Sequence, residues 1–489
     1  MSERSPLRRR ALRGALVTVL GQGAGQVFRV VSNLVLTRLL APEAFGVMSI
    51  VYLVINGLTL ISDVGIRPAI VRHERGDDPA FLDTAWTLSV LRGLALWAAA
   101  AALAFPLARF YAMPALAVLI PAAGVVSFVA GFEATKLTTL MRSVALGRRV
   151  AIELAAQGIA FVAMLAAAWI AASVWVLVIG AVVAVAARVA LSFLAVPGRG
   201  NRLRWDRAAA DQLRSFGRWI FVSSLFTFLA MRMDVAVLGR LVPPDVLGVY
   251  SIGITVVVVL RDVLGRVLSS VLMPVLADAQ RSSFASFAAR HAQSQAVLLH
   301  GGVVLIAAAV VASPPFFALL YDPRYAAAGW ISQLALLALW FGLLQSASQR
   351  ASEALGDSRS VALSEAAKTL ATAAGCVGGW SLAGLPGLIV GSALGNVVGW
   401  ALAAARLRAH GVSVFSADVR YTLLGAAVAS VACGLPVLLG ARVLGREPTP
   451  LETAAFGFAA VSPLALSAAA RLQREMKKVA PAQPEPAAP

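Results

Sequence analysis

The chain has 489 residues, of which 59% are hydrophobic and only 13% charged, with a mean hydropathy of +0.81. No soluble fold needs that much apolar surface, so the composition excludes a soluble globular protein and predicts a polytopic membrane protein. The net charge of +18 does not indicate nucleic-acid binding, because the basic residues fall mostly between the apolar runs.

Apolar runs of about twenty residues follow one another along the chain and do not alternate, which favours helices over a β-barrel. We predict an all-α membrane protein with about 14 transmembrane helices. The expected spans are 14–38, 45–67, 84–105, 114–135, 150–171, 173–195, 219–240, 246–274, 295–320, 329–349, 361–380, 386–405, 420–441 and 451–470. The expected domains are an N-lobe (1–195, helices 1–6), a cytoplasmic linker (196–218), a C-lobe (219–408, helices 7–12), a helix pair (409–470) and a disordered cytoplasmic tail (471–489).

The loops between these spans predict the orientation. With the N-terminus in the cytoplasm, about 28 basic residues lie on the cytoplasmic side and about six on the other, far more bias than orientation requires. Both termini are therefore expected in the cytoplasm. We expect no cleaved signal peptide, because the first apolar run is too long for one.

A motif near the first helix recurs in the second half of the chain. TRLLAPEAFGVMSI (37–50) and GRLVPPDVLGVYSI (239–252) match in register, 202 positions apart. Each copy would hold six spans, an even number, so the two lobes should lie parallel in the membrane. Such repeats enclose a central cavity, with the binding site at their interface.

The first span carries a stripe of four polar residues, Gln22, Gln26, Arg29 and Asn33, at spacings of four, three and four. On a helix these spacings place all four side chains on one face. A charged residue at the bilayer centre costs roughly 3 kcal/mol on insertion scales, so the stripe should face a wet cavity or another helix.

Charged residues inside other spans extend this pattern. They are Asp63, Arg67, Arg92, Arg188, Arg232, Asp234, Arg261, Asp262, Arg266, Glu365 and Lys368. About half of the intramembrane charges should have structural roles, such as helical pairs at Asp262–Arg266 and Asp63–Arg67. Arginine still exceeds the carboxylates, and its guanidinium matches phosphate oxygens. A cationic cavity for a phosphate-bearing substrate is therefore expected.

No catalytic motif is found. There is no P-loop, no HExxH and no nucleophile elbow, and no loop is long enough for a soluble catalytic domain. We expect a transporter rather than an enzyme, with no metal site.

Several segments resemble the MOP flippase superfamily, in particular its polysaccharide-transporter (Wzx-like, oligosaccharide flippase) branch. They are residues 21–51, the Asp63-Val64-Gly65 tripeptide, FLDTAWTLSVLRG (81–93) and the turns ALGRRV and ALGDSRSV. The resemblance implies two six-helix lobes that open alternately to either side, and arginines on helices 1 and 8 that hold a pyrophosphate. By position Arg29 and Arg261 or Arg266 correspond to these arginines.

This resemblance also implies a function. The expected activity is translocation of an undecaprenyl-pyrophosphate-linked oligosaccharide from the inner to the outer leaflet of the bacterial inner membrane. The expected partners are this polyprenyl-linked glycan, membrane lipids and polysaccharide polymerase machinery, without nucleic acid. No cofactor is expected, although H⁺ or Na⁺ coupling through Asp63, Asp234 or Asp262 is an open alternative. Two alternative functions are a MATE-like cation-coupled drug antiporter and a MurJ-like lipid II flippase, which uses the last helix pair as a lipid groove.

Overall fold

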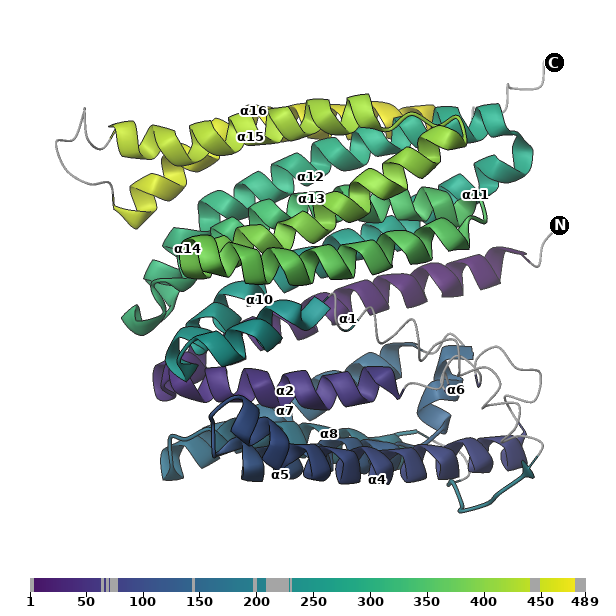
Figure 1. Cartoon of the computed structure of the whole chain (residues 1–489). Coiled ribbons are helices and arrows are strands. Elements are labelled where there is room, and N and C mark those ends of the chain that lie inside the picture. Colours follow the sequence, from purple (N-terminus) through teal and green to yellow (C-terminus); the bar gives the residue numbers. More distant parts are fainter. Residues whose placement is uncertain are drawn as a thin grey trace. The chain divides into compact units, whose positions relative to one another are not determined.

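The computed structural model describes residues 4–62, 66, 70, 78–142, 146–196, 200–207, 228, 231–439 and 449–479. All regular structure in this part of the chain is helical (Figure 1). The chain divides into two compact units, Met1–Ser251 and Ile252–Pro489, each with its own helix–helix contacts.

The first unit is a bundle of apolar helices. They are α1 (Arg4–Leu39), α2 (Pro42–Ile61), α4 (Pro79–Phe110), α5 (Leu116–Gly131), α6 (Lys136–Arg142), α7 (Leu146–Ile170), α8 (Trp175–Leu194), the helical residues 231–241 and the start of α10 (Pro244–Val267). α4 packs along α5, and α7 packs along α8 and α1. Glycine permits the close approach of α4 and α5, because a Cβ at Gly93 would lie 2.6 Å from the Ser127 carbonyl oxygen.

The second unit contains the remaining helices. They are the rest of α10, a π-helical segment (Leu268–Leu272), α11 (Met273–Ser282), α12 (Phe284–Leu320), a 3-10 turn (Pro323–Tyr325), α13 (Ala328–Ala354), α14 (Ser358–Ala409), α15 (Phe415–Leu439) and α16 (Pro450–Val479). α13 packs against α12 and α14, while α12 also contacts α15 and α16. This unit therefore includes the predicted C-terminal helix pair, α15 and α16.

α14 is a hairpin rather than one straight helix. Its backbone leaves helical geometry at Ala383 and at Gly384, where φ is 60°. Cβ atoms at Gly375 or Gly379 would overlap the backbone of Gly391 or Gly387, so the two arms touch through glycine. The two predicted spans 361–380 and 386–405 are these two arms.

The predicted all-α membrane fold is confirmed. Among the described residues, nine helices are long and apolar enough to cross a membrane, and α5 is a shorter apolar helix. Half of the predicted span 219–240, namely residues 219–227, 229 and 230, lies outside the described residues. The tail predicted to be disordered from residue 471 begins inside α16, which continues to Val479, because its polar end is still compatible with helix; residues 480–489 lie outside the described part.

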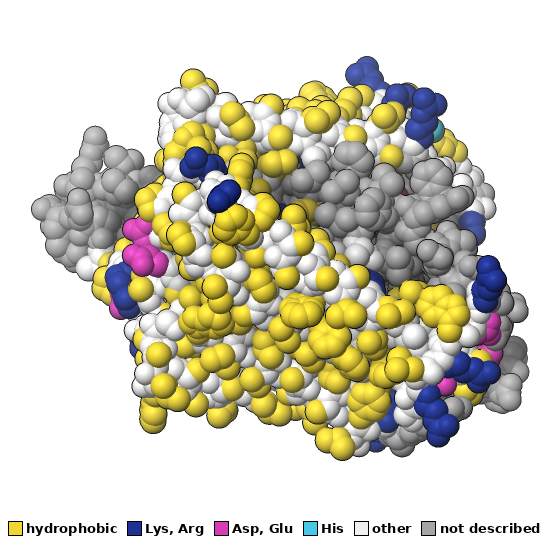
Figure 2. Space-filling view, turned by 60° about the horizontal axis from the view of Figure 1, so that its bottom comes forward, with side chains coloured by type: hydrophobic (Ala, Val, Ile, Leu, Met, Phe, Trp, Pro, Cys, Tyr) yellow, Lys and Arg dark blue, Asp and Glu magenta, His cyan; other side chains and the backbone are white. Residues whose placement is uncertain are grey.

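Large hydrophobic side chains lie on the outside of the helices, among them Ile170 and Leu382, each 88% exposed. Figure 2 shows hydrophobic side chains over most of the visible face, with Lys and Arg gathered near its edges. In water such a surface would aggregate, so the protein is a multi-pass membrane protein with lipid against this face.

Candidate substrate-binding site

The polar stripe on α1 lies next to the face that packs on α7. A Cβ at Gly25 would lie 3.7 Å from the Gln157 side chain, and the rings of Phe28 and Phe161 meet edge to face at 5.6 Å. Arg29, one position beyond Phe28, is exposed. Gln26 and Asn33 are half-buried, and the side chain of Gln22 lies outside the described part.

A second arginine of the first unit lies in the helical residues 231–241. Arg232 is half-buried and forms no ion pair with a described residue. Its neighbour Asp234 accepts a short hydrogen bond from the Tyr250 hydroxyl of α10. Tyr250 belongs to the second copy of the repeated motif, so this bond ties that copy to the helix before it. Asp63 and Arg67 lie outside the described residues.

In the second unit, α10 carries the other predicted residues. Arg261 and Arg266 are half-buried, while Asp262 is exposed. Among the described residues, Asp262 and Arg266 do not form the ion pair that their spacing of four would allow. Arg261 lies close enough to Lys368 of α14 for their positive charges to repel.

Lys368 belongs to a polar cluster between α13 and α14. The Glu365 Oε1 oxygen accepts a hydrogen bond from Gln345 Nε2 at 3.0 Å and another from Gln349 Nε2, and lies 3.9 Å from Lys368 Nζ. Gln345 is fully buried. Sequence reasoning missed both glutamines, although two glutamines four residues apart in an apolar span are a readable signal of a polar helix face.

A second buried cluster centres on Asp418 at the start of α15. Its carboxylate accepts hydrogen bonds from Gln295 Nε2 of α12 at 2.6 Å and Trp400 Nε1 of α14 at 2.7 Å. Asp418 is 1% exposed. Sequence analysis missed Asp418 because this residue lies just before the predicted span 420–441, in a loop where a charged side chain is expected to be exposed.

Other intramembrane arginines have structural partners, as expected for about half of them. Arg188 Nε of α8 lies 3.2 Å from Glu133 and its Nη1 lies 3.8 Å from Glu153 of α7. Arg92 of α4 donates hydrogen bonds to the Ser62 hydroxyl and to the Thr59 carbonyl oxygen at the end of α2. These arginines are committed to holding helices together and are poor candidates for substrate binding.

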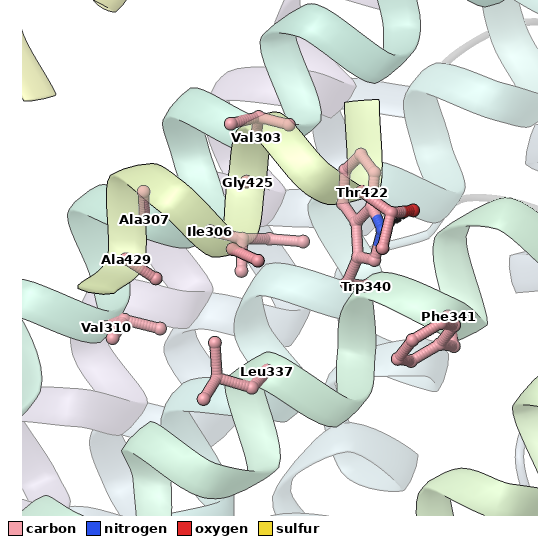
Figure 3. Close-up of a pocket in the computed structure, with 11 residues that line it drawn as sticks. Val303, Ile306, Ala307, Val310, Leu337, Trp340, Phe341, Thr422, Gly425 and Ala429 are labelled. Carbon is pink, nitrogen blue, oxygen red and sulfur yellow. Dashed lines mark hydrogen bonds between the residues drawn. The ribbon is translucent and has the colours of Figure 1, made fainter. Parts of the chain in front are cut away.

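An apolar cleft lies between α12, α13 and α15 of the second unit (Figure 3). Its walls include Ile306, Val310, Leu337 and Ala429. Among the described residues that line it, Trp340 and Thr422 have polar side chains, and the Trp340 indole Nε1 donates a hydrogen bond to the Thr422 hydroxyl at 2.8 Å. The cleft therefore suits an apolar chain.

The fold is shared with known transporters. It is similar to the lipid II flippase MurJ in an inward closed conformation, with a TM-score of 0.67 and 10% identity over 93% of this chain and 98% of that one. It is also similar to an inward-facing multidrug resistance MATE family transporter of the MOP superfamily, with a TM-score of 0.60 and 15% identity over 78% of this chain and 95% of that one. Identities this low show the fold alone. No curated protein matches the chain.

These features define a multi-pass membrane protein with the fold of the MOP superfamily. Residues 35–328 match the family described as polysaccharide biosynthesis protein. This match covers more than half of the chain, and the chain belongs to that family. The family expected from the sequence is confirmed.

Proposed function

We propose that the protein is a flippase. It moves an undecaprenyl-pyrophosphate-linked oligosaccharide, a surface polysaccharide precursor, from the inner to the outer leaflet of the bacterial inner membrane by alternating access. Both termini lie in the cytoplasm, and the products pass to polysaccharide polymerase machinery. Membership of a polysaccharide biosynthesis family and a transporter fold support this proposal.

The observation that carries the proposal is a pair of arginines that have no acidic partner among the residues that the structure describes. Arg29 and Arg232 lie in helices of the apolar first unit, and neither forms an ion pair with a described carboxylate. A guanidinium retained in a membrane helix without a counter-charge needs an anion from elsewhere. A diphosphate supplies that anion and matches the guanidinium fork.

The membrane potential supplies a driving force for this step. The outward movement of two negative charges across an inside-negative potential is favourable by about 4.6 kcal/mol per 100 mV. Coupling to H⁺ or Na⁺ through Asp63, Asp234 or Asp262 is the competing arrangement. Substrate export in vesicles with an imposed potential but no ion gradient separates the two.

The apolar cleft of the second unit supports a role in holding the lipid. A prenyl or acyl chain fits walls of Ile306, Val310 and Leu337 without stranding a polar group. A Cβ at Gly425 would meet only Val303 at 3.5 Å, so Gly425→Leu would fill the cleft. This variant should lower crosslinking of a photoactivatable prenyl lipid without loss of folded protein.

Single substitutions test the diphosphate role. Arg29→Ala and Arg232→Ala should each abolish most export of surface polysaccharide and cause the lipid-linked precursor to accumulate on the inner leaflet. Arg29→Lys should retain part of the activity, because it keeps the charge and loses the fork. The matched control is Arg109→Ala, which removes an exposed arginine that packs on the Phe105 ring. Normal export by both Arg29→Ala and Arg232→Ala would overturn the proposal.

The same assays distinguish the alternatives. A lipid II flippase would be identified by accumulation of lipid II and arrested cell-wall synthesis when the gene is removed. A MATE-like antiporter would be identified by cationic drug efflux and unchanged polysaccharide. The excess of arginine over carboxylates inside the predicted spans argues against the export of cations, for which acidic residues are suited.

A further inference from the structure

A short segment after α8 is tied to the first turns of α4. The backbone N–H groups of Arg202, Arg204 and Asp206 donate hydrogen bonds of 3.0–3.1 Å to side chains of α4. The acceptors are Asp83 Oδ1, Thr87 Oγ1 and Thr84 Oγ1, all on buried residues. We call residues 200–207 the strap; Figure 1 draws it as a thin teal trace beside α4.

The strap is also fixed at its start. Asn201 donates from Nδ2 to the Thr135 hydroxyl at 2.7 Å, and its Oδ1 accepts from the Thr135 backbone N–H at 3.0 Å. Alternate backbone amides of the strap are therefore satisfied by polar side chains on one face of α4. These hydrogen bonds hold the strap in one defined conformation.

Most of the other side chains of the strap are exposed. Leu203 is 73% exposed and Trp205 is 53% exposed. Arg202, Arg204 and Arg207 are exposed, and none of the three forms an ion pair with a described carboxylate. Three guanidinium groups interleaved with a leucine and a tryptophan form a surface that is both cationic and apolar.

The position of the strap explains this combination. Its anchors Asp83, Thr84 and Thr87 lie within the first three turns of α4, an apolar helix that is long enough to cross the membrane. The strap is thus held at the end of a membrane span, where Trp prefers the interface and Arg meets lipid phosphates. Basic residues near a bilayer surface are attracted to anionic headgroups.

We propose that the strap is a membrane-surface anchor for anionic phospholipids. Arg202, Arg204 and Arg207 bind headgroup phosphates, while Leu203 and Trp205 enter the interface. The ligand is bulk anionic lipid of the leaflet that faces the strap, and the proposal does not depend on which glycan the protein carries.

The test places a nitroxide spin label at Leu203→Cys in the full chain, with Cys376 and Cys433, both free thiols, replaced by alanine. The protein is placed in nanodiscs of neutral phosphatidylcholine, or of the same lipid with phosphatidylglycerol. Collision with a water-soluble nickel chelate should be about threefold lower in the anionic nanodiscs, and collision with oxygen higher. The difference should shrink at high salt.

Two matched variants establish the chemistry. Arg202→Gln/Arg204→Gln/Arg207→Gln should remove the lipid dependence, and the corresponding lysine triple should keep it. Removing the same charge elsewhere, with Arg148→Gln/Arg290→Gln/Arg408→Gln at three other exposed arginines, should leave it unchanged. A label at Leu91→Cys, on the exposed side of α4, reports whether each variant is folded. A collision rate with the nickel chelate that is high in both lipids would overturn the proposal. A rate that is low in both would also overturn it, because it would show an apolar anchor only.

Discussion

Gly46 and Gly248, the equivalent glycines of the two motif copies, pack reciprocally. A Cβ at Gly46 would overlap the Pro244 carbonyl oxygen, and a Cβ at Gly248 would overlap the Pro42 carbonyl oxygen. Each would also lie 3.0 Å from the backbone nitrogen of the other glycine. Because Pro42 and Pro244 begin α2 and α10, the two copies start their helices alike and touch each other through these starts.

This contact predicts a double-mutant result. Gly46→Ala and Gly248→Ala should each lower the free energy of unfolding by about 1–3 kcal/mol. The added methyl group would overlap a backbone carbonyl oxygen, which cannot move aside as a flexible side chain can. The double variant should cost clearly less than the sum, since the first methyl already separates the helices. Thermal unfolding in detergent measures all three. Gly158→Ala, at a helical glycine with nothing within 4 Å, is the control and should not destabilise. Additive losses would contradict a shared contact.

Arg188 should be needed because it holds two carboxylates. Arg188→Met leaves Glu133 and Glu153 without their cation, and with side chains only partly exposed the expected loss is roughly 1–3 kcal/mol. Adding Glu133→Gln should recover part of that loss, because Glu133 is the more buried carboxylate. Unfolding midpoints measure both variants. No recovery would show that Arg188 acts by packing alone.

Asp418 should hold three helices of the second unit together. Asp418→Ala leaves the buried Gln295 donor and the half-buried Trp400 donor without an acceptor, each at a cost on the order of 1–3 kcal/mol. Asp418→Asn keeps an acceptor oxygen and should cost less. Trp400→Phe removes one donor and should be milder than Asp418→Ala. Thermal stability of purified protein ranks the variants, and equal losses for Asp418→Ala and Asp418→Asn would refute the role of acceptor geometry.

Asp357 should make the cap of α14 sensitive to pH. Its carboxylate accepts from the Ser360 backbone N–H at 3.1 Å and from the Ser360 hydroxyl, and these bonds, with His410 and Arg406 nearby, lower the pKa of Asp357. A lowered folded-state pKa means that the stabilisation is present above the unfolded pKa, about 3.9, and is lost as pH falls through the folded value.

The variant Asp357→Ala should therefore be less stable than the native protein at neutral pH, and the gap should close as the pH is lowered below about 4. Asp357→Asn is the control, because asparagine caps as well as aspartate but does not titrate. Unfolding midpoints across pH provide the measurement. A gap that is constant with pH would show that the capping bond does not depend on ionisation.

The class of fold could be predicted from the sequence because the requirement that lipid places on a membrane span applies to each segment separately. Each span must be apolar over its own length, so windows of single segments suffice, and the hairpin of α14 could be read from its two apolar arms. The repeated motif could also be read, because its proline and glycine spacing survives in both copies. Arg29 was predicted as a site residue in the same way, from one helix alone, and that role stays a prediction.

Partners across helices could not be read in this way. Asp418 accepts hydrogen bonds from Gln295 and Trp400, and Glu365 accepts them from two glutamines. These pairings depend on which helix faces come together. The amides of the strap reach Asp83 and its neighbours more than 100 positions away along the chain. Local sequence determined that these segments are apolar helices and basic loops; only tertiary packing decided which buried polar group satisfies which, because hydrogen bonds need three-dimensional proximity that apolar periodicity does not encode.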